Sequence, residues 1–241
     1  MTNQTYGRGQ IENALWRTFA PFDKNVKDLS GEGGSAFRTR IRRLLEIDRT
    51  GGFEAANGAT IAEYAFAPAP ETEGGALAFE TKDVFRMAVA LEFLALGFKQ
   101  REAVELVYYL RSDLDTLLKR SFFSYVIDPD NPLLPDQYPR LPKIIVDDIV
   151  YRDPRIYLLI KSAELEEIDF EFKGKTAKKK RAPVFMMVDG ISALQETIGG
   201  LSLRTFRSMT VVELAYLAQR VTSTLQNSQP IRRGRKKAAA T

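Results

Sequence analysis

The spacing of apolar side chains predicts helices throughout the first half of the chain. Apolar residues recur every three or four positions in residues 10–19, 35–49, 82–96 and 99–110, and residues 114–123 predict one more short helix. This spacing places the apolar side chains on one face of each helix, where they can pack against a core.

The residue types at the ends of these segments indicate where the helices begin and end. Ser35 and Thr81 are expected N-caps, because a hydroxyl can accept a hydrogen bond from a free N–H of the first turn. Asp83 lies in the first turn of its helix, where the helix dipole favours an acid. Gly97 is expected to end that helix.

Other apolar runs have the spacing of strands. Residues 61–66 and 76–79 are expected to pair as a hairpin across a glycine turn. Residues 156–160, 168–172 and 184–188 predict three further strands, the last of them central in its sheet.

Prolines at positions 129, 132, 135, 139 and 142 mark the clearest boundary in the chain. Each proline fixes φ and removes a backbone donor, so neither a helix nor a central strand is expected there. The prediction is an α+β fold with a mostly helical domain over residues 1–126 and a proline-rich linker over residues 127–142. A smaller α/β domain of unknown role then covers residues 143–226, and a disordered basic tail covers residues 227–241.

Positive charge is gathered into three short segments. The whole chain has 35 Lys and Arg against 31 Asp and Glu, a net charge of +4. Residues 35–49 carry +3, residues 173–181 carry +6 and residues 230–241 carry +5, which leaves −10 for the rest. Clusters of this kind create local positive potential and favour a polyanionic partner.

The chain contains no cysteine and no histidine, which narrows its chemistry. Disulfides, Ser-His and Cys-His catalysis and most zinc sites are excluded, while carboxylate chemistry and magnesium remain open. Residues 174–176 lack the glycines of a phosphate-binding loop. We therefore expect that the protein is not an enzyme and that it binds neither a metal nor a cofactor. The polar N-terminus and the absence of a long apolar run predict a cytoplasmic protein without a membrane span.

The expected order of elements is a helix, a helix with a basic face, a hairpin and two further helices. Residues 83–110 run as a helix into a Gly-Phe turn, here Leu96, Gly97 and Phe98, and then into a second helix. Over about residues 10–110 this order resembles the winged helix-turn-helix of MerR-type bacterial regulators. The resemblance implies a DNA-binding regulator. Residues 20–34 separate the first two helices where the family has a tight turn, so the architecture alone is carried over.

The predicted contacts with double-stranded DNA lie in the three basic segments. A helix that has one apolar face and one arginine face suits the major groove, where arginine can bond guanine in a bidentate way. The predicted DNA-binding residues are Arg38, Thr39, Arg40, Arg42, Arg43 and Arg49 in the helix, Lys178, Lys179, Lys180 and Arg181 in the loop, and Arg232, Arg233 and Arg235 in the tail. The alternatives are a solvated surface helix, a solvated loop and a solubilising tail.

Residues 210–226 predict an amphipathic helix that Thr210 opens, with Glu213 three positions later as in a capping box. The apolar stripe of this helix offers a dimer seam or, as the commoner explanation, a face that packs on the chain's own sheet. The stripe consists of Val211, Leu214, Leu217, Val221 and Leu225.

Two functions fit these basic segments. The first is a transcriptional regulator that binds duplex DNA, as a homodimer. The second is an interaction or assembly module whose basic segments bind an acidic protein partner. Pairing of the arginine face with acids of the chain itself, such as Glu46 or Asp48, would favour the second function.

Overall fold

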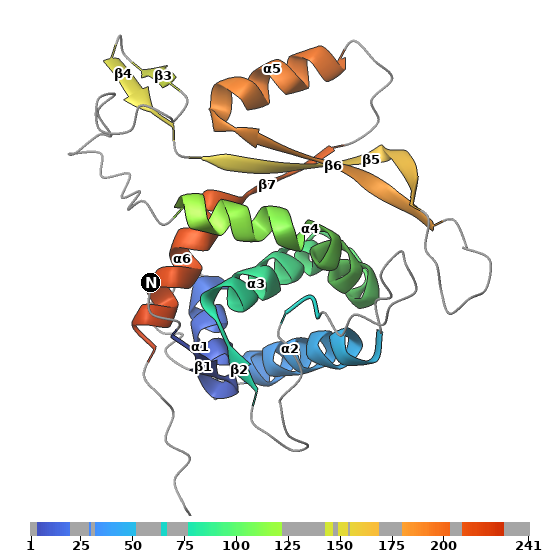
Figure 1. Ribbon diagram of the computed structural model, residues 1–241, viewed down its shortest axis with the longest axis vertical. Coiled ribbons are helices and arrows are strands. Elements are labelled where there is room, and N and C mark those ends of the chain that lie inside the picture. The colour runs from blue at the N-terminus through green and yellow to red at the C-terminus, as the bar shows by residue number, and fades with distance from the viewer. Residues whose placement is uncertain are drawn as a thin grey trace, which may run out of the picture.

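The fold is known from a computed structural model (Figure 1). It describes residues 4–19, 29, 32–51, 64–66, 77–121, 143–146, 149–153, 155–168, 180–202 and 209–228. The described elements, in chain order, are β1 (Tyr6–Gly7), α1 (Arg8–Phe19), α2 (Glu32–Gly51), β2 (Ala78–Phe79), α3 (Thr81–Ala95), α4 (Gln100–Ser121), β3 (Lys143–Val146), β4 (Ile149–Arg152), β5 (Ile156–Ile168), β6 (Lys180–Asp189), α5 (Gly190–Ser202), β7 (Met209–Glu213) and α6 (Leu214–Gln226). The expected mixture of helix and sheet is confirmed.

Helix α3 forms the centre of a helical layer. Residues 83–91 are all buried, and the helix contacts α1, α4 and α6. Phe85 and Phe93 are fully buried within this core. Gly97 has a φ of 92° and lies directly after the helix, so its predicted role in ending α3 is confirmed.

A three-stranded antiparallel sheet lies against one side of the helical layer (Figure 1). The strand order is β6-β5-β7, so β5 is central, and the prediction that residues 184–188 form the central strand is wrong. Successive side chains of a strand point to opposite faces. Ile156 and Leu158 accordingly join the helical core, whereas Tyr157 and Leu159 pack with Leu194 of α5 on the other face.

Helix α6 returns from the sheet to the start of the chain. It contacts α1 and α3, and the hydroxyl groups of Thr18 and Thr224 lie 3.0 Å apart. The predicted start at Thr210 is wrong, because residues 210–213 belong to β7. Glu213 is the N-cap itself, and its carboxylate accepts the N–H groups of Ala215 and Tyr216. The chain's last described helix is thus packed as part of the helical bundle.

Three further predictions about the helices differ from the structure. α2 begins at Glu32 rather than after Ser35, and Gly34 lies inside the helix at a point where a Cβ would collide with the backbone of Leu29. Glu80, not Thr81, precedes the first turn of α3, and its N–H donates to the Asp83 carboxylate at 2.7 Å. α4 is one continuous helix where the sequence predicts two.

The predicted hairpin between residues 61–66 and 76–79 is also wrong. β2 pairs with β1, with Phe79 opposite Tyr6. Ala65 and Phe66 donate their N–H groups to the carboxylate of Asp48 on α2 instead of to a neighbouring strand. The proline-rich linker, residues 169–172 and the basic tail from residue 229 lie outside the described residues.

Candidate nucleic-acid interface

The five arginines of α2 lie on its exposed side and spread over two flanks. The buried side of the helix carries Phe37, Ile41 and Leu44. Because an α-helix turns once in about 3.6 residues, Arg38, Arg42 and Arg49 share one flank of the opposite side. Arg40 and Arg43 are also exposed and lie further round the helix. The predicted arginine face is therefore real, and it is broad.

Contacts with the core explain why this side of α2 faces outward. Trp16 of α1 meets Phe37 edge to face, with 5.3 Å between the ring centroids. α2 also contacts α4 along its buried side. Burial of these large apolar side chains fixes the rotation of the helix about its axis. The arginines are exposed as a consequence.

A hollow lies between the first turn of α1 and the arginine face. Its volume is about 370 Å³, and it is lined by Arg8, Gly9, Glu12, Ser35, Arg38, Thr39 and Arg42. Three arginines and one glutamate thus line the hollow. The hollow carries an excess of positive charge, and guanidinium groups match the geometry of phosphate oxygens.

Glu12 holds two of these arginines. Its carboxylate lies 2.9 Å from Nε of Arg8 and 3.7 Å from Nε of Arg38. The Glu12 side chain is only 12% exposed, whereas both arginine side chains are more than 40% exposed. The guanidinium groups therefore keep donors free for a further anion while Glu12 sets their positions.

The other members of the predicted face differ in what they contact. Nε of Arg42 lies 3.6 Å from the carboxylate of Glu46, one turn along the helix. Within the described part of the chain, neither Arg40 nor Arg43 has an ion-pair partner. Thr39 donates its hydroxyl to the carbonyl of Ser35 at 3.0 Å, so this side chain is bonded within its own helix.

Asp48 does not neutralise the arginine face. It is buried on the opposite side of α2 and accepts the N–H groups of Ala65 and Phe66 at 2.7 and 3.1 Å. Burial raises the pKa of Asp48 from 3.8 to about 6, although the two N–H donors and the neighbouring Arg49 and Arg86 lower it. Its role is to fix residues 64–66 against the helix.

Arg86 of α3, in contrast, lies in the core rather than at the interface. Its Nε donates to Asp115 of α4 at 2.8 Å, and a second nitrogen bonds the other oxygen of the same carboxylate. A third nitrogen faces the carbonyl of Ala65 and the carboxylate of Asp83. Burial raises the pKa of Asp83 to about 6. This network ties α3, α4 and residues 64–66 together.

The other two predicted DNA-binding segments cannot be placed beside α2. Lys178 and Lys179 of the loop and Arg232, Arg233 and Arg235 of the tail lie outside the described residues. The backbone of Lys180 and Arg181 belongs to β6, but their side chains lie outside the described part.

The predicted dimer stripe is mostly core. Leu214, Leu217, Val221 and Leu225 are buried in the cluster that α6 shares with α1 and α3, which agrees with packing inside one chain. Val211 is exposed, but it belongs to β7 rather than to the helix. The homodimer stays a prediction, and its interface would need other residues.

Comparison with protein-family models, with curated proteins and with solved structures finds no match for this chain. Among the described residues no group of three or more carboxylates could hold a metal ion. None of the described helices combines the length and apolar character needed to cross a membrane.

The sequence reasoning missed Arg8 and Glu12 as part of the interface. Their spacing of four residues does indicate an ion pair along α1. Nothing local indicates that this pair lies beside Arg38, because that contact depends on how α1 packs against α2.

Proposed function

We propose that this protein binds double-stranded DNA through the exposed face of α2 and acts as a transcriptional regulator. The observation that carries the proposal is the set of arginines on one helix whose guanidinium groups are exposed, with Arg40 and Arg43 unpaired in the described part of the chain. Exposed guanidinium groups on a helix suit both base edges and phosphates.

The hollow beside α2 supports the same proposal. α2 has 20 residues, a length of ~30 Å, enough to follow a major groove. Arg8 and Arg38 lie at the hollow's rim, where the phosphate backbone that borders the groove would pass. In this arrangement Arg8 and Arg38 contact the phosphates of one strand, while Arg40 and Arg43 contact phosphates of the opposite strand and the base edges beside them.

The test is fluorescence anisotropy of a labelled random-sequence duplex, titrated with the protein between low and physiological salt. The double variant Arg40→Ala/Arg43→Ala is expected to bind about tenfold more weakly and to lower the slope of log K against log salt by about 2. The control is Arg101→Ala on α4, which removes a 67% exposed arginine from another helix. Equal binding by wild type and the double variant would contradict the proposal.

Regulation requires preference for a sequence as well as affinity. Selection from a random duplex library should enrich one motif with wild-type protein, and the Arg40→Ala/Arg43→Ala variant should lose that enrichment. If the wild type recovers an unbiased pool, it binds DNA without sequence preference, and the proposal that it is a transcriptional regulator is contradicted.

One observation favours the second candidate, an interaction module for an acidic protein. Glu12 and Glu46 already bind Arg38 and Arg42, so carboxylates fit this face. A glutamate-rich peptide of the same total charge as the duplex separates the two candidates. Tighter binding of the duplex supports DNA, whereas tighter binding of the peptide supports the acidic protein.

A further inference from the structure

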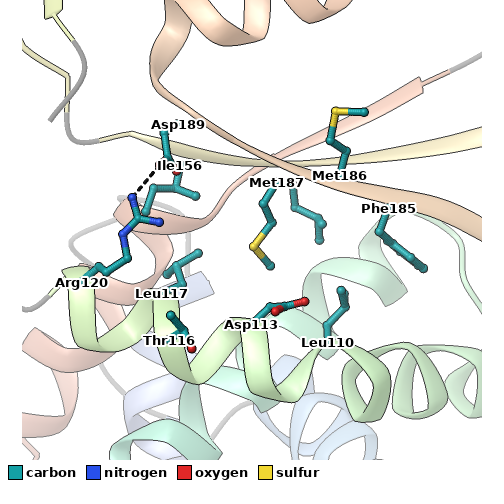
Figure 2. A pocket seen from close by; sticks show the side chains of 11 residues that line it. Leu110, Asp113, Thr116, Leu117, Arg120, Ile156, Phe185, Met186, Met187 and Asp189 are labelled. Atoms are coloured by element: carbon teal, nitrogen blue, oxygen red, sulfur yellow. Dashed lines mark hydrogen bonds and ion pairs between the residues drawn. The ribbon is translucent and has the colours of Figure 1, made fainter. Parts of the chain in front are cut away.

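A second cavity, of about 330 Å³, lies between α4 and the sheet (Figure 2). Leu110 and Leu117 of α4 form one wall, and Ile156 of β5 with Phe185 and Met187 of β6 form the other. Figure 2 shows the side chains of Phe185 and Met187 pointing from the sheet towards α4. The walls are mostly apolar, and the volume lies at the lower end of the range of sites for small organic molecules.

The charges at this cavity do not balance. Arg120 of α4 and Asp189 of β6 form an ion pair at 2.6 Å at one end, so each neutralises the other. Asp113 lies about two turns before Arg120, on the side of α4 that lines the cavity (Figure 2). Among the described residues Asp113 has no hydrogen-bond or ion-pair partner. The described lining therefore carries a net charge of −1, at the exposed carboxylate of Asp113.

We propose that this cavity binds a small apolar organic cation, an alkyl- or arylammonium with a single charged nitrogen. The ammonium group would pair with Asp113. The apolar part of the ligand would lie against Phe185 and Met187, and the sulfur of Met187 is suited to contact with an aromatic ring. The inference does not depend on DNA binding.

The lining argues against the two other simple classes of ligand. An organic anion would meet Asp113 and would have to displace Asp189 from Arg120. A metal ion needs several ligands at fixed distances, and the described lining offers one unpaired carboxylate beside apolar side chains.

Three probes that share one skeleton test the proposal by isothermal titration calorimetry on the full chain. These are 4-phenylbutylammonium, the neutral 4-phenylbutanol and the anionic 4-phenylbutyrate. The ammonium is expected to bind with a Kd of about 1 mM or below, and the alcohol about fivefold more weakly. The butyrate is expected to give no heat of binding.

The variant Asp113→Asn then locates the charge. It is expected to weaken the ammonium about fivefold and to leave the alcohol unchanged. The matched control is Glu196→Gln, which removes an exposed carboxylate from α5 and should change neither affinity. Asp113 is exposed, so the variant keeps its fold, which far-UV circular dichroism checks. Butyrate binding as tight as that of the ammonium, equal ammonium affinity in Asp113→Asn, or no binding of any probe would overturn the proposal.

Discussion

Arginine occupies two opposite environments in this protein. Arg86 on α3 is 8% exposed, and its guanidinium contacts Asp115, Asp83 and the carbonyl of Ala65. Arg40 and Arg43 on α2 are exposed and, in the described part of the chain, have no ion pair. The same side chain therefore serves the fold in one helix and is available for a ligand in the other.

The difference follows from the hydrogen-bond acceptors that water offers to a guanidinium group. A guanidinium that leaves water needs protein acceptors for its donors, since an unpaired buried charge is strongly unfavourable. An exposed guanidinium is satisfied by water, which a phosphate can replace. Burial, rather than residue type or position on a helix, thus separates the structural arginine from the binding arginines, and four variants test that distinction.

The largest effect is expected from Arg86→Met. It leaves two carboxylates, Asp83 and Asp115, without their cation inside or beside the core. The free energy of unfolding should fall by about 3 kcal/mol, measured by urea unfolding followed by circular dichroism. The matched change Arg40→Met, on the exposed face, should cost under about 0.5 kcal/mol. Similar losses in both variants would remove the distinction between the two environments.

The next largest effect on stability is expected at Asp48, the buried carboxylate that binds the N–H groups of Ala65 and Phe66. Burial raises the pKa of Asp48 to about 6 from 3.8, so the folded state holds this proton at a higher pH than the unfolded state. Stability contributed by the protonated group is therefore present below about pH 4 and is lost as the pH rises to about 6.

Asp48→Asn carries no titrating group at this position and isolates the effect. From pH 4 to pH 7 the free energy of unfolding of the variant should gain about 2 kcal/mol relative to wild type. Urea unfolding at a series of pH values measures this difference. The opposite slope would mean that the N–H groups of Ala65 and Phe66 outweigh burial and lower the pKa.

The amphipathic helices could be predicted because their stripes are local features. Phe37, Ile41 and Leu44 recur at helical spacing, and the same stripe determines which side of α2 exposes arginine. The first turn of that helix could not be predicted from local residue types, because it contains glycines, one of which lies against the backbone of Leu29. The N-cap preference of serine pointed to Ser35 instead.

Tertiary contacts also decide the strands and most of the site. Residues 78–79 pair with Tyr6 and Gly7, which are remote in sequence, while Asp48 takes the N–H groups that the expected hairpin needed. Similarly, residue type gave no sign that Arg86 is buried or that Glu12 reaches Arg38. Local patterns thus predicted the arginine face of α2, but not that Arg8 and Glu12 of α1 lie beside it.

A smaller effect is expected from Glu12→Gln, which sharpens the exposed side of the comparison. The change removes the carboxylate that holds Arg8 and Arg38 and leaves three arginines around the hollow. Duplex affinity should rise about fivefold with a steeper salt dependence, because two guanidinium groups lose a competing anion. Anisotropy measures both quantities, with Glu196→Gln as the equal change of charge elsewhere. A fall in affinity would show that Glu12 orients the arginines more than it competes with DNA.

The smallest effect is expected from Glu46→Gln, and it tests burial most directly. Arg42 and Glu46 form an ion pair at 3.6 Å, but the side chains are 58% and 62% exposed. The arginine also precedes the glutamate, the less favourable order along a helix. The free energy of unfolding should therefore change by less than about 0.5 kcal/mol, and duplex affinity should rise about twofold as Arg42 is released. A loss of stability as large as that of Arg86→Met would mean that ion pairing itself, and not burial, decides which arginines hold the fold together.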